Sequence, residues 1–330
     1  MGWGIGLVRN TLGRTLLFIA VAACSASIAK ALTPADWAYP LDSPAAGAQP
    51  AADVATPLRL PDSTATFTQA QLLDPFATPD WRPDEHPAMP AIVASGRKPD
   101  VMACGFCHLP TGNGRPENAA LAGLPRDYII AQMQYFRDGS RSTSVADREP
   151  TALMIALAKA SSDAEIAAAA DYFSALPRQS FVRVVETDAV PKMRVAGWIY
   201  TPAAGTETEP LGSRIVETAD DIERFGRRDS RTTYVAYAPP GSIARGEKAA
   251  RSWGEGAYAC GNCHGSNFEG MDAVPPLAGK SPTYLARQLH DFKTGARRGA
   301  DADLMLPVVE EMGNEDIVAI AAYLASRKPD

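Results

Sequence analysis

The sequence reads Cys104-Gly105-Phe106-Cys107-His108 in its first half and Cys260-Gly261-Asn262-Cys263-His264 in its second half. Both stretches follow the pattern Cys-x-x-Cys-His, in which two thiols bond to the vinyl groups of a c-type haem and the histidine reaches the iron from one side. Five residues thus attach a cofactor and supply one ligand of its metal. A redox disulfide and a zinc site are the alternative interpretations of a single Cys-x-x-Cys.

The cysteine inventory supports two haem groups. The chain has 330 residues and five cysteines, and the two motifs, which lie 156 residues apart in similar surroundings, use four of them: Cys104, Cys107, Cys260 and Cys263. Two matching copies favour two covalently bound haem c groups over either alternative. The fifth thiol, Cys24, lies near the N-terminus, so no thiol is left for a structural disulfide.

Residues 1–31 are typical of an export signal. Arg9 and Arg14 give a positive start, and the apolar run of residues 16–23 is too short to span a bilayer. Two kinds of processing stay open: cleavage after Ala31, at a small-x-small site, or lipidation of Cys24, which ends a lipobox-like sequence. We expect a periplasmic protein that touches the membrane only through a lipid anchor at Cys24, where one is attached.

The charge of the chain limits its partners. The formal net charge is −6, and removal of a signal with three basic and no acidic residues makes the chain more acidic. Nucleic acid requires a basic face, so it is not an expected partner. The charge fits a carrier that meets periplasmic redox proteins with positive patches, although simple solubility explains it equally well.

The sequence also contains an internal repeat. Leu121-Ala122-Gly123 recurs as Leu277-Ala278-Gly279, and further residues recur with the same offset of 156. These residues are Tyr128, Gln132, Phe136, Gly139 and Arg141, which correspond to Tyr284, Gln288, Phe292, Gly295 and Arg297. Later matches, after a loss of five residues, pair Met154, Ile166 and Tyr172 with Met305, Ile317 and Tyr323. Two homologous domains are therefore expected, over residues 86–178 and 242–330.

Within these domains the apolar periodicity predicts helices. A helix over 126–138 is closed by Gly139, and a helix over 163–176 begins with a capping box of Ser162 and Glu165. A further helix over about 243–253 leads into the second motif.

Two segments fall outside the repeat. Residues 32–85 are rich in Pro, Ala, Asp and Thr, which predicts a largely irregular N-terminal arm. Residues 179–241 are longer than a simple hinge, and their β-prone stretches at 181–185 and 233–237 predict short strands packed across both domains. The expected fold is mainly α, with two tandem domains joined by a long, partly β connector.

Each iron has two axial positions, and His108 and His264 are expected to take one position at each haem. The only other histidines in the sequence are His86 and His290. His290 has no counterpart in the first domain, and we expect both to be ordinary solvated side chains.

Methionine is the better candidate for the second position. Met154 lies 46 residues after His108, and Met305 lies 41 residues after His264, each before the last helix of its domain. Methionine is also common core filling. The matching positions nevertheless favour ligation, whereas the rivals Met133 and Met312 are not repeated.

Neighbouring residues are expected to support these ligands. A ligating imidazole usually donates its other N–H to an acceptor, and the carbonyl of Pro275 is placed to accept from His264. Ala119 and Ala120 occupy the corresponding place in the first domain. Tyr128 and Tyr284 are interpreted first as core aromatics, with a hydrogen bond to a haem propionate as the alternative.

Taken together, these residues resemble the class I cytochromes c, and among them the tandem di-haem, c-four type. The resemblance rests on both motifs, on Pro275-x-Leu277-x-Gly279, on the repeated Leu-Ala-Gly…Tyr…Phe…Gly-x-Arg pattern, and on Met154 and Met305. It covers about half of the chain. It implies two small helical domains, each around one haem, that shuttle electrons in the periplasm. The arm and the connector depart from the family pattern.

Six-coordinate iron cannot bind oxygen or peroxide without losing a ligand, so the expected function is single-electron transfer and not catalysis. The leading hypothesis is a periplasmic di-haem carrier between a dehydrogenase or other donor and a terminal acceptor. One alternative is a cytochrome subunit of a periplasmic dehydrogenase. The other is a di-haem peroxidase, which the two repeated methionines and the scarcity of histidines disfavour.

Overall fold

The computed structural model describes residues 1–2, 36–41 and 55–329. The apolar run of the expected export signal, Cys24 and the expected cleavage site after Ala31 lie outside the described residues. Among the residues that are described, no helix is long and apolar enough to cross a membrane.

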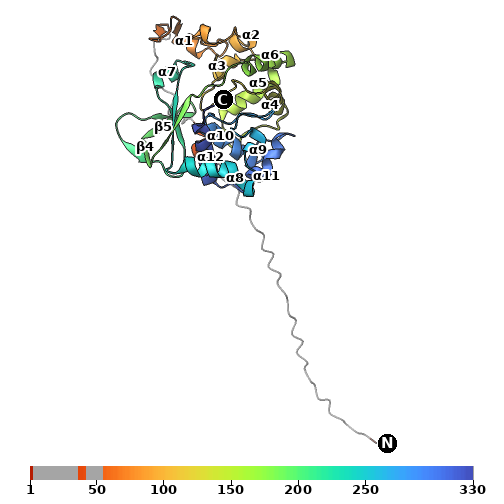
Figure 1. Cartoon of the computed structure of the whole chain (residues 1–330). Coiled ribbons are helices and arrows are strands. Elements are labelled where there is room, and N and C mark those ends of the chain that lie inside the picture. The colour runs from red at the N-terminus through yellow and green to blue at the C-terminus, as the bar shows by residue number, and fades with distance from the viewer. Residues whose placement is uncertain (3–35, 42–54, 330) are drawn as a thin grey trace. The chain divides into compact units, whose positions relative to one another are not determined.

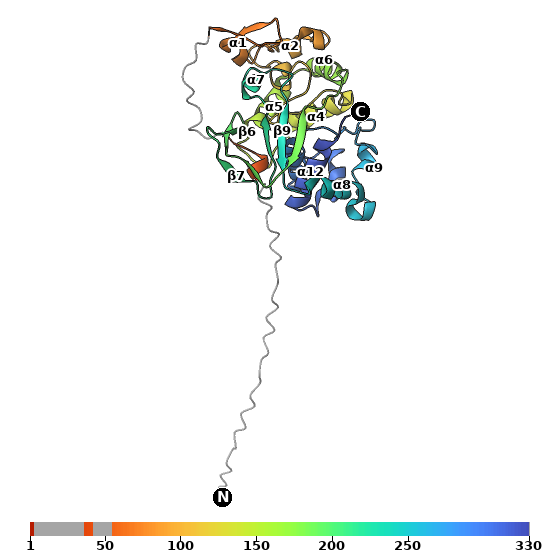
Figure 2. The ribbon, with the colours of Figure 1, turned by 60° about the vertical axis from the view of Figure 1, so that its left-hand side comes forward.

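The first repeated segment, residues 86–178, folds into helices that gather beside one another (Figures 1 and 2). They are α2 (Ala91–Ala94), α3 (Cys104–His108), α4 (Arg126–Asp138), α5 (Glu149–Ala160) and α6 (Asp163–Ser174). Gly139 ends α4 with a left-handed φ of 85°, and the side chains of Ser162 and Glu165 form the predicted capping box of α6. The predicted helix starts are confirmed, and α6 ends two residues earlier than expected.

The second repeated segment has the same order of elements. Its helices are α8 (Ser242–Ser252), α9 (Gly261–His264), α10 (Pro282–Lys293), α11 (Leu306–Val309) and α12 (Asn314–Ser326), with 3₁₀ turns η4 (Trp253–Gly256) and η5 (Ala302–Met305). The five-residue deletion falls where α5 is replaced by the shorter η5 and α11. Every residue from Ile317 to Ala325 is buried, so α12 is the centre of this core.

Helices α8 and α12 cross at very close range. A Cβ atom at Gly246 would lie 1.9 Å from the carbonyl oxygen of Ala319 and 2.7 Å from Cβ of Tyr323. Only glycine therefore permits this approach, and Gly246 fixes where the first and last helices of the second domain meet.

The connector forms a small mixed sheet with two hairpins beside it. Strands β3 (Val182–Glu186) and β9 (Tyr234–Ala238) pair in parallel, and β8 (Val216–Ala219) pairs antiparallel with β9. The hairpins join β4 (Ala189–Pro191) to β7 (Thr208–Pro210) and β5 (Met193–Ala196) to β6 (Ile199–Pro202). Val182, Ala236 and Ile215 share one buried cluster with Ile317 and Ile320, so the sheet is part of the core of the second domain. Helix α7 (Ile222–Gly226) follows β8.

The arm is more ordered than the sequence suggested. The expected irregular segment 32–85 contains η1 (Asp36–Ala38), β1 (Pro57–Arg59), β2 (Thr66–Thr68), α1 (Gln69–Leu73) and η3 (Pro83–Glu85) where it is described. Leu60, Leu72 and Trp81 form a small core of their own. Trp81 also donates its indole N–H to the carbonyl of Arg227, 2.8 Å away, which ties the arm to the connector.

Long-range contacts explain why composition alone underestimated this order. Arg82 and Arg224 both bind Asp62 at 3.0 Å and also reach the buried carboxylate of Asp229. Tyr39 lies in the core of the second domain and donates to Asp291 at 2.8 Å. The described residues from Asp36 onward belong to one compact unit.

Candidate haem sites

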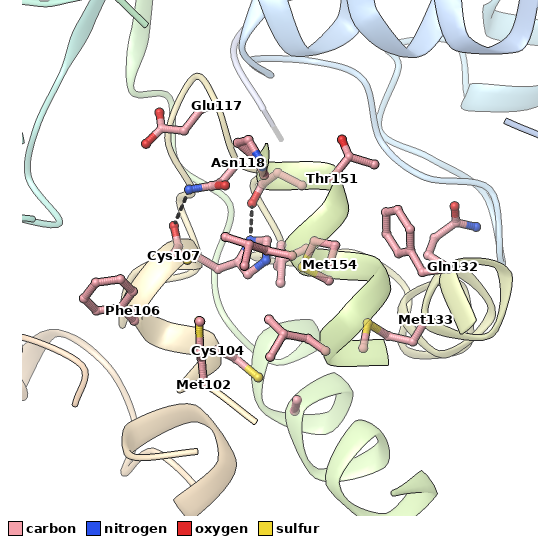
Figure 3. Close-up of a pocket in the computed structure, with 18 of the residues that line it drawn as sticks. Met102, Cys104, Phe106, Cys107, Glu117, Asn118, Gln132, Met133, Thr151 and Met154 are labelled. Atoms are coloured by element: carbon pink, nitrogen blue, oxygen red, sulfur yellow. Dashed lines mark hydrogen bonds between the residues drawn. The ribbon is translucent and has the colours of Figure 1, made fainter. Parts of the chain in front are cut away.

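The first motif opens onto a cavity of about 410 Å³. Cys104, Cys107, His108 and Met154 all line it, so the structure brings together the four residues that the sequence proposed for the first haem. Figure 3 shows Cys104 and Cys107 on one side of this space and Met154, carried by α5, on another. Apolar side chains supply much of the remaining wall, including Leu121, Leu124, Ile129, Leu157 and Phe173.

The imidazole of His108 is fixed in orientation. Its Nδ1 lies 2.8 Å from the carbonyl oxygen of Ala119, which can only accept, so Nδ1 carries the proton and Nε2 is left with a lone pair. Burial lowers the pKa of His108, an effect that the hydrogen bond to Ala119 partly opposes. A neutral imidazole with a free Nε2 is the form that ligates iron.

The thiols of the first motif lie in an environment that keeps them neutral. Burial raises the pKa of Cys104 to about 12 and also raises the pKa of Cys107, although Arg228 and Arg115 act against the second shift. Redox-active cysteines instead have lowered pKa values and form thiolates. The surroundings of this Cys-x-x-Cys therefore disfavour the thioredoxin-like alternative.

The second motif has the same local geometry. His264 Nδ1 lies 2.8 Å from the carbonyl oxygen of Pro275, as the sequence predicted, and burial lowers the pKa of His264. The backbone N–H of Gly270 donates to the backbone carbonyl oxygen of His264 at 2.8 Å, and that of Gly114 donates to the backbone carbonyl oxygen of His108 at 3.1 Å. The loops after both motifs therefore fold alike and orient their histidines in the same way.

The methionine candidates differ in how fully the structure places them. Met154 lines the first cavity, but Met133 on α4 and Met102 line it as well (Figure 3). Met305 ends η5 and packs, together with Cys260, against the main buried cluster of the second domain. Met312 is fully buried in that same cluster. The repeat of Met154 and Met305 remains the argument that separates them from Met133 and Met312.

A network that the sequence did not predict joins the two domains. Arg141 donates to Gln132 of its own domain at 2.8 Å and to Gln288 of the other at 3.0 Å. Arg297 donates to Gln288 at 2.9 Å and to Gln132 at 2.9 Å. The two arginines also form a β-bridge, so matching residues of the repeat meet around an approximate twofold relation.

The repeated tyrosines belong to this network. Arg297 donates to the hydroxyl of Tyr128 at 2.8 Å, and Arg141 lies 3.3 Å from the hydroxyl of Tyr284. The simpler interpretation, that both are plain core aromatics, is therefore incomplete. The recurrence of all six residues was visible in the sequence, but the contact between the two copies was not.

Two further buried arginines line the first cavity. Burial lowers the pKa of Arg148 to about 9, and the neighbouring Arg287 adds to the effect. Arg148 is held by the carbonyl oxygens of Pro40 and Glu117, at 3.5 Å and 3.4 Å, and Arg287 by those of Ala38 and Pro116. Buried cations favour an anionic occupant, and a haem carries two carboxylates. The cavity therefore has the features that a haem requires: two thiols for attachment, a histidine to bind the iron, a largely apolar wall, and buried arginines to face its carboxylates.

Two expectations about other histidines were wrong. His290 is 6% exposed, and the imidazole of His86 is buried between Asp80, 3.2 Å from Nε2, and the hydroxyl of Tyr172, 3.1 Å from Nδ1. Both are packed side chains and not solvated ones. The sequence missed this because their partners come from other segments of the chain.

Two covalent attachment motifs, each on a small helical domain with an oriented histidine, define a c-type cytochrome. The family model of cytochrome c matches residues 244–328. The thiosulfate dehydrogenase electron acceptor of Thiomonas intermedia is 28% identical over 243 residues, which cover 73% of this chain and 85% of that protein. Cytochrome c4 of Azotobacter vinelandii is 27% identical over 244 residues, or 72% of this chain and 90% of that protein.

A shorter relative has higher identity. Cytochrome c-554(548) of Halomonas halodenitrificans is 39% identical over 70 residues, which cover 21% of this chain and 84% of that protein. The chain belongs to the cytochrome c family, as a tandem di-haem member similar to the cytochromes c4. It binds two haem c groups covalently and transfers electrons.

Proposed function

We propose that this protein is a non-catalytic carrier in the periplasm, with one haem in each of the domains 86–178 and 242–330. Cys104 and Cys107 attach the first haem, and Cys260 and Cys263 attach the second. His108 and Met154 are the proposed axial ligands of the first iron, and His264 and Met305 those of the second.

The residues of the site favour electron transfer without substrate binding. A bound haem would supply a one-electron couple, and ligation by histidine and methionine would raise its potential relative to ligation by two histidines. The carbonyls of Ala119 and Pro275 hold the imidazoles in one orientation. Much of the wall of the first cavity is apolar, which would limit the access of water to a bound haem, and Arg148 and Arg287 line the same cavity, where they would neutralise its carboxylates.

The observation that carries the ligand proposal is the position of Met154. It lines the same cavity as His108, Cys104 and Cys107, and its repeat partner Met305 packs against the same buried cluster as Cys260. Methionine ligation would leave no open position on the iron, which disfavours the peroxidase alternative.

Substitution of the methionines tests this assignment. We expect Met154→Ala and Met305→Ala each to open one iron, so that each reduced variant binds one carbon monoxide per chain while the unmodified protein binds none. Met133→Ala is the matched control, because Met133 lines the first cavity without being repeated. Carbon monoxide binding by Met133→Ala in place of Met154→Ala would refute the assignment, and binding by the unmodified protein would favour the peroxidase.

The proposed location rests on residues 1–31. The intact mass of the protein recovered from the periplasm or from the membrane distinguishes cleavage after Ala31 from lipidation of Cys24. A full-length chain retained in the cytoplasm would contradict export.

The proposed partners are a dehydrogenase or another donor on one side and a terminal acceptor on the other. Two relatives are named as electron acceptors of thiosulfate dehydrogenase, which supports a dehydrogenase as the donor. The alternative, a permanent cytochrome subunit of such an enzyme, predicts that a dehydrogenase co-purifies with this chain in equal amounts. A free carrier co-purifies with none.

A further inference from the structure

The two haem-attachment motifs have the same backbone but different surroundings. In the first domain every residue from His108 to Glu117 is buried. In the second domain the matching stretch, 264–273, is exposed at Ser266 and Asn267 and again over residues 271–273. Because the loops themselves fold alike, the difference comes from what covers them.

The connector covers the face of the first motif. The guanidinium carbon of Arg228 lies 3.6 Å from the centre of the Phe106 ring, and Arg228 donates to the carbonyl of Phe106 at 2.9 Å. The guanidinium carbon of Arg115 lies 3.8 Å from the ring centre of Phe225. Asn113 donates to the carbonyl of Ser230 at 3.3 Å. The loop after the first motif is therefore sealed from outside.

The arm adds to this cover. Arg228 donates to the carbonyl of Leu72 at 3.1 Å. A Cβ atom at Gly105 would lie 2.7 Å from the hydroxyl oxygen of Thr78, so the arm packs directly against the first motif. The two segments that distinguish this chain from the family pattern thus meet on one face of one domain.

The matching face of the second domain is open. Asn262, which corresponds to buried Phe106, is exposed, and Cys263 is exposed as well. Met271, which corresponds to the buried Arg115, is 48% exposed, and Tyr258 is 42% exposed. Two large apolar side chains therefore flank the second motif at the surface.

The charged side chains of the segment that forms this face are all acidic, while two arginines from outside it, Arg251 and Arg178, donate to the backbone carbonyls of Ser266 and Glu269. Residues 252–276 contain Glu255, Glu269 and Asp272 and no lysine or arginine. Glu255 and Asp272 are exposed. An apolar centre with acidic neighbours is complementary to a surface on which lysines and arginines surround an apolar redox edge.

We propose that this protein exchanges electrons with its protein partner across the face of the second domain that carries Tyr258, Asn262, Cys263, Met271 and Asp272. The partner is a redox protein with basic residues around its redox group. The first domain exchanges electrons with the second and does not dock the partner through its own motif. This inference rests on the proposed function. In each exchange one side loses one electron and the other gains it, and no bond forms or breaks.

Glu255 and Asp272, the exposed acidic residues beside the apolar centre, form an acidic rim, and neutralising this rim tests the docking face. The holoprotein variant Glu255→Gln/Asp272→Asn is compared with Asp188→Asn/Glu207→Gln, which removes the same charge from exposed residues of the connector. The probe is a strongly basic monohaem cytochrome c, and stopped-flow absorbance gives the second-order rate constant. We expect a decrease of about 3- to 10-fold at low salt for the rim variant, less than about 2-fold at high salt, and little change for the control.

The apolar centre is tested separately. Met271→Ala is expected to weaken exchange at high and low salt alike, whereas Ile222→Ala, at a side chain that is 39% exposed in α7 of the connector, is expected to have no effect. Equal effects of the two substitutions would overturn the proposed contact.

Cross-linking gives a readout that does not depend on rate. Carbodiimide joins carboxylates to lysines, so mass spectrometry of the product with the same probe should place the links on Glu255, Glu269 or Asp272. The inference would be overturned if the links fell mainly on the connector or the first domain. It would also be overturned if the rim variant and the control variant slowed the exchange equally. Reduction of every variant by ascorbate separates this outcome from failure of the proposed function, in which the holoprotein accepts no electrons at all.

Discussion

At the scale of the residue, both histidines are prepared for iron by the backbone. A carbonyl oxygen holds Nδ1 at 2.8 Å in each domain, although the residue that supplies it changes from Ala119 to Pro275. A backbone acceptor does not depend on the side chain, so the sequence can vary there without loss of the hydrogen bond. Burial keeps both imidazoles neutral.

Lys280 is a residue whose protonation should affect stability. It is buried where the domains meet, and its ammonium donates to the carbonyl of Ala120 at 3.1 Å. Burial lowers its pKa from 10.5 to about 7, with a smaller contribution from Arg178. Between these two values the unfolded chain binds more protons than the folded chain, so the free energy of unfolding rises with pH from about 7 upward.

Replacement of this lysine should remove that slope. We expect Lys280→Met to flatten the rise, which is at most about 1.4 kcal/mol per pH unit. Urea unfolding of both holoproteins at pH 7 and pH 9 measures the difference. An unchanged slope in Lys280→Met would show that Lys280 is not its source.

At the scale of the element, close packing of helices decides the second domain. Helix α8 approaches α12 where Gly246 faces Ala319, and the whole central run of α12 is buried. The stripe of apolar residues in α12 was evident from the sequence. The crossing point was not, because it depends on a residue in a helix about 70 positions away.

A methyl group at this crossing should be costly. Gly246→Ala is expected to lower the free energy of unfolding by about 1–3 kcal/mol or more, because the contact at 1.9 Å is with rigid backbone. Gly226→Ala in α7 is the matched control, since a Cβ there meets nothing within 4 Å. Chemical denaturation compares the two. Equal stability of both variants would contradict the close crossing.

Local pattern predicted more of this protein than composition did. The motif spacing, the capping box of Ser162 and the carbonyl of Pro275 are local features, and the structure forms the helix start and the hydrogen bond that they predicted. The order of the arm and the burial of His290 depend on contacts between distant segments. Tyr39, for example, reaches Asp291 across 252 positions of sequence. No periodicity in either segment signals such a contact.

At the scale of the whole molecule, the two repeats contact each other symmetrically where they meet, but their outer surfaces differ. Arg141 and Arg297 exchange hydrogen bonds with matching glutamines across the domain boundary. On the outside, the described parts of the arm and the connector cover the first motif, through residues such as Arg228, and leave the second motif exposed. Duplication explains the symmetric interior, and the two added segments give each domain a different role.

The proposal of histidine–methionine ligation at both irons can be measured directly by iron K-edge X-ray absorption on the oxidised holoprotein. Histidine–methionine ligation predicts an average shell of five nitrogens and one sulfur per iron, with the sulfur lost from half of the irons in Met154→Ala and from the other half in Met305→Ala. A shell of six nitrogens at either iron, or a five-coordinate iron in the unmodified protein, would contradict it.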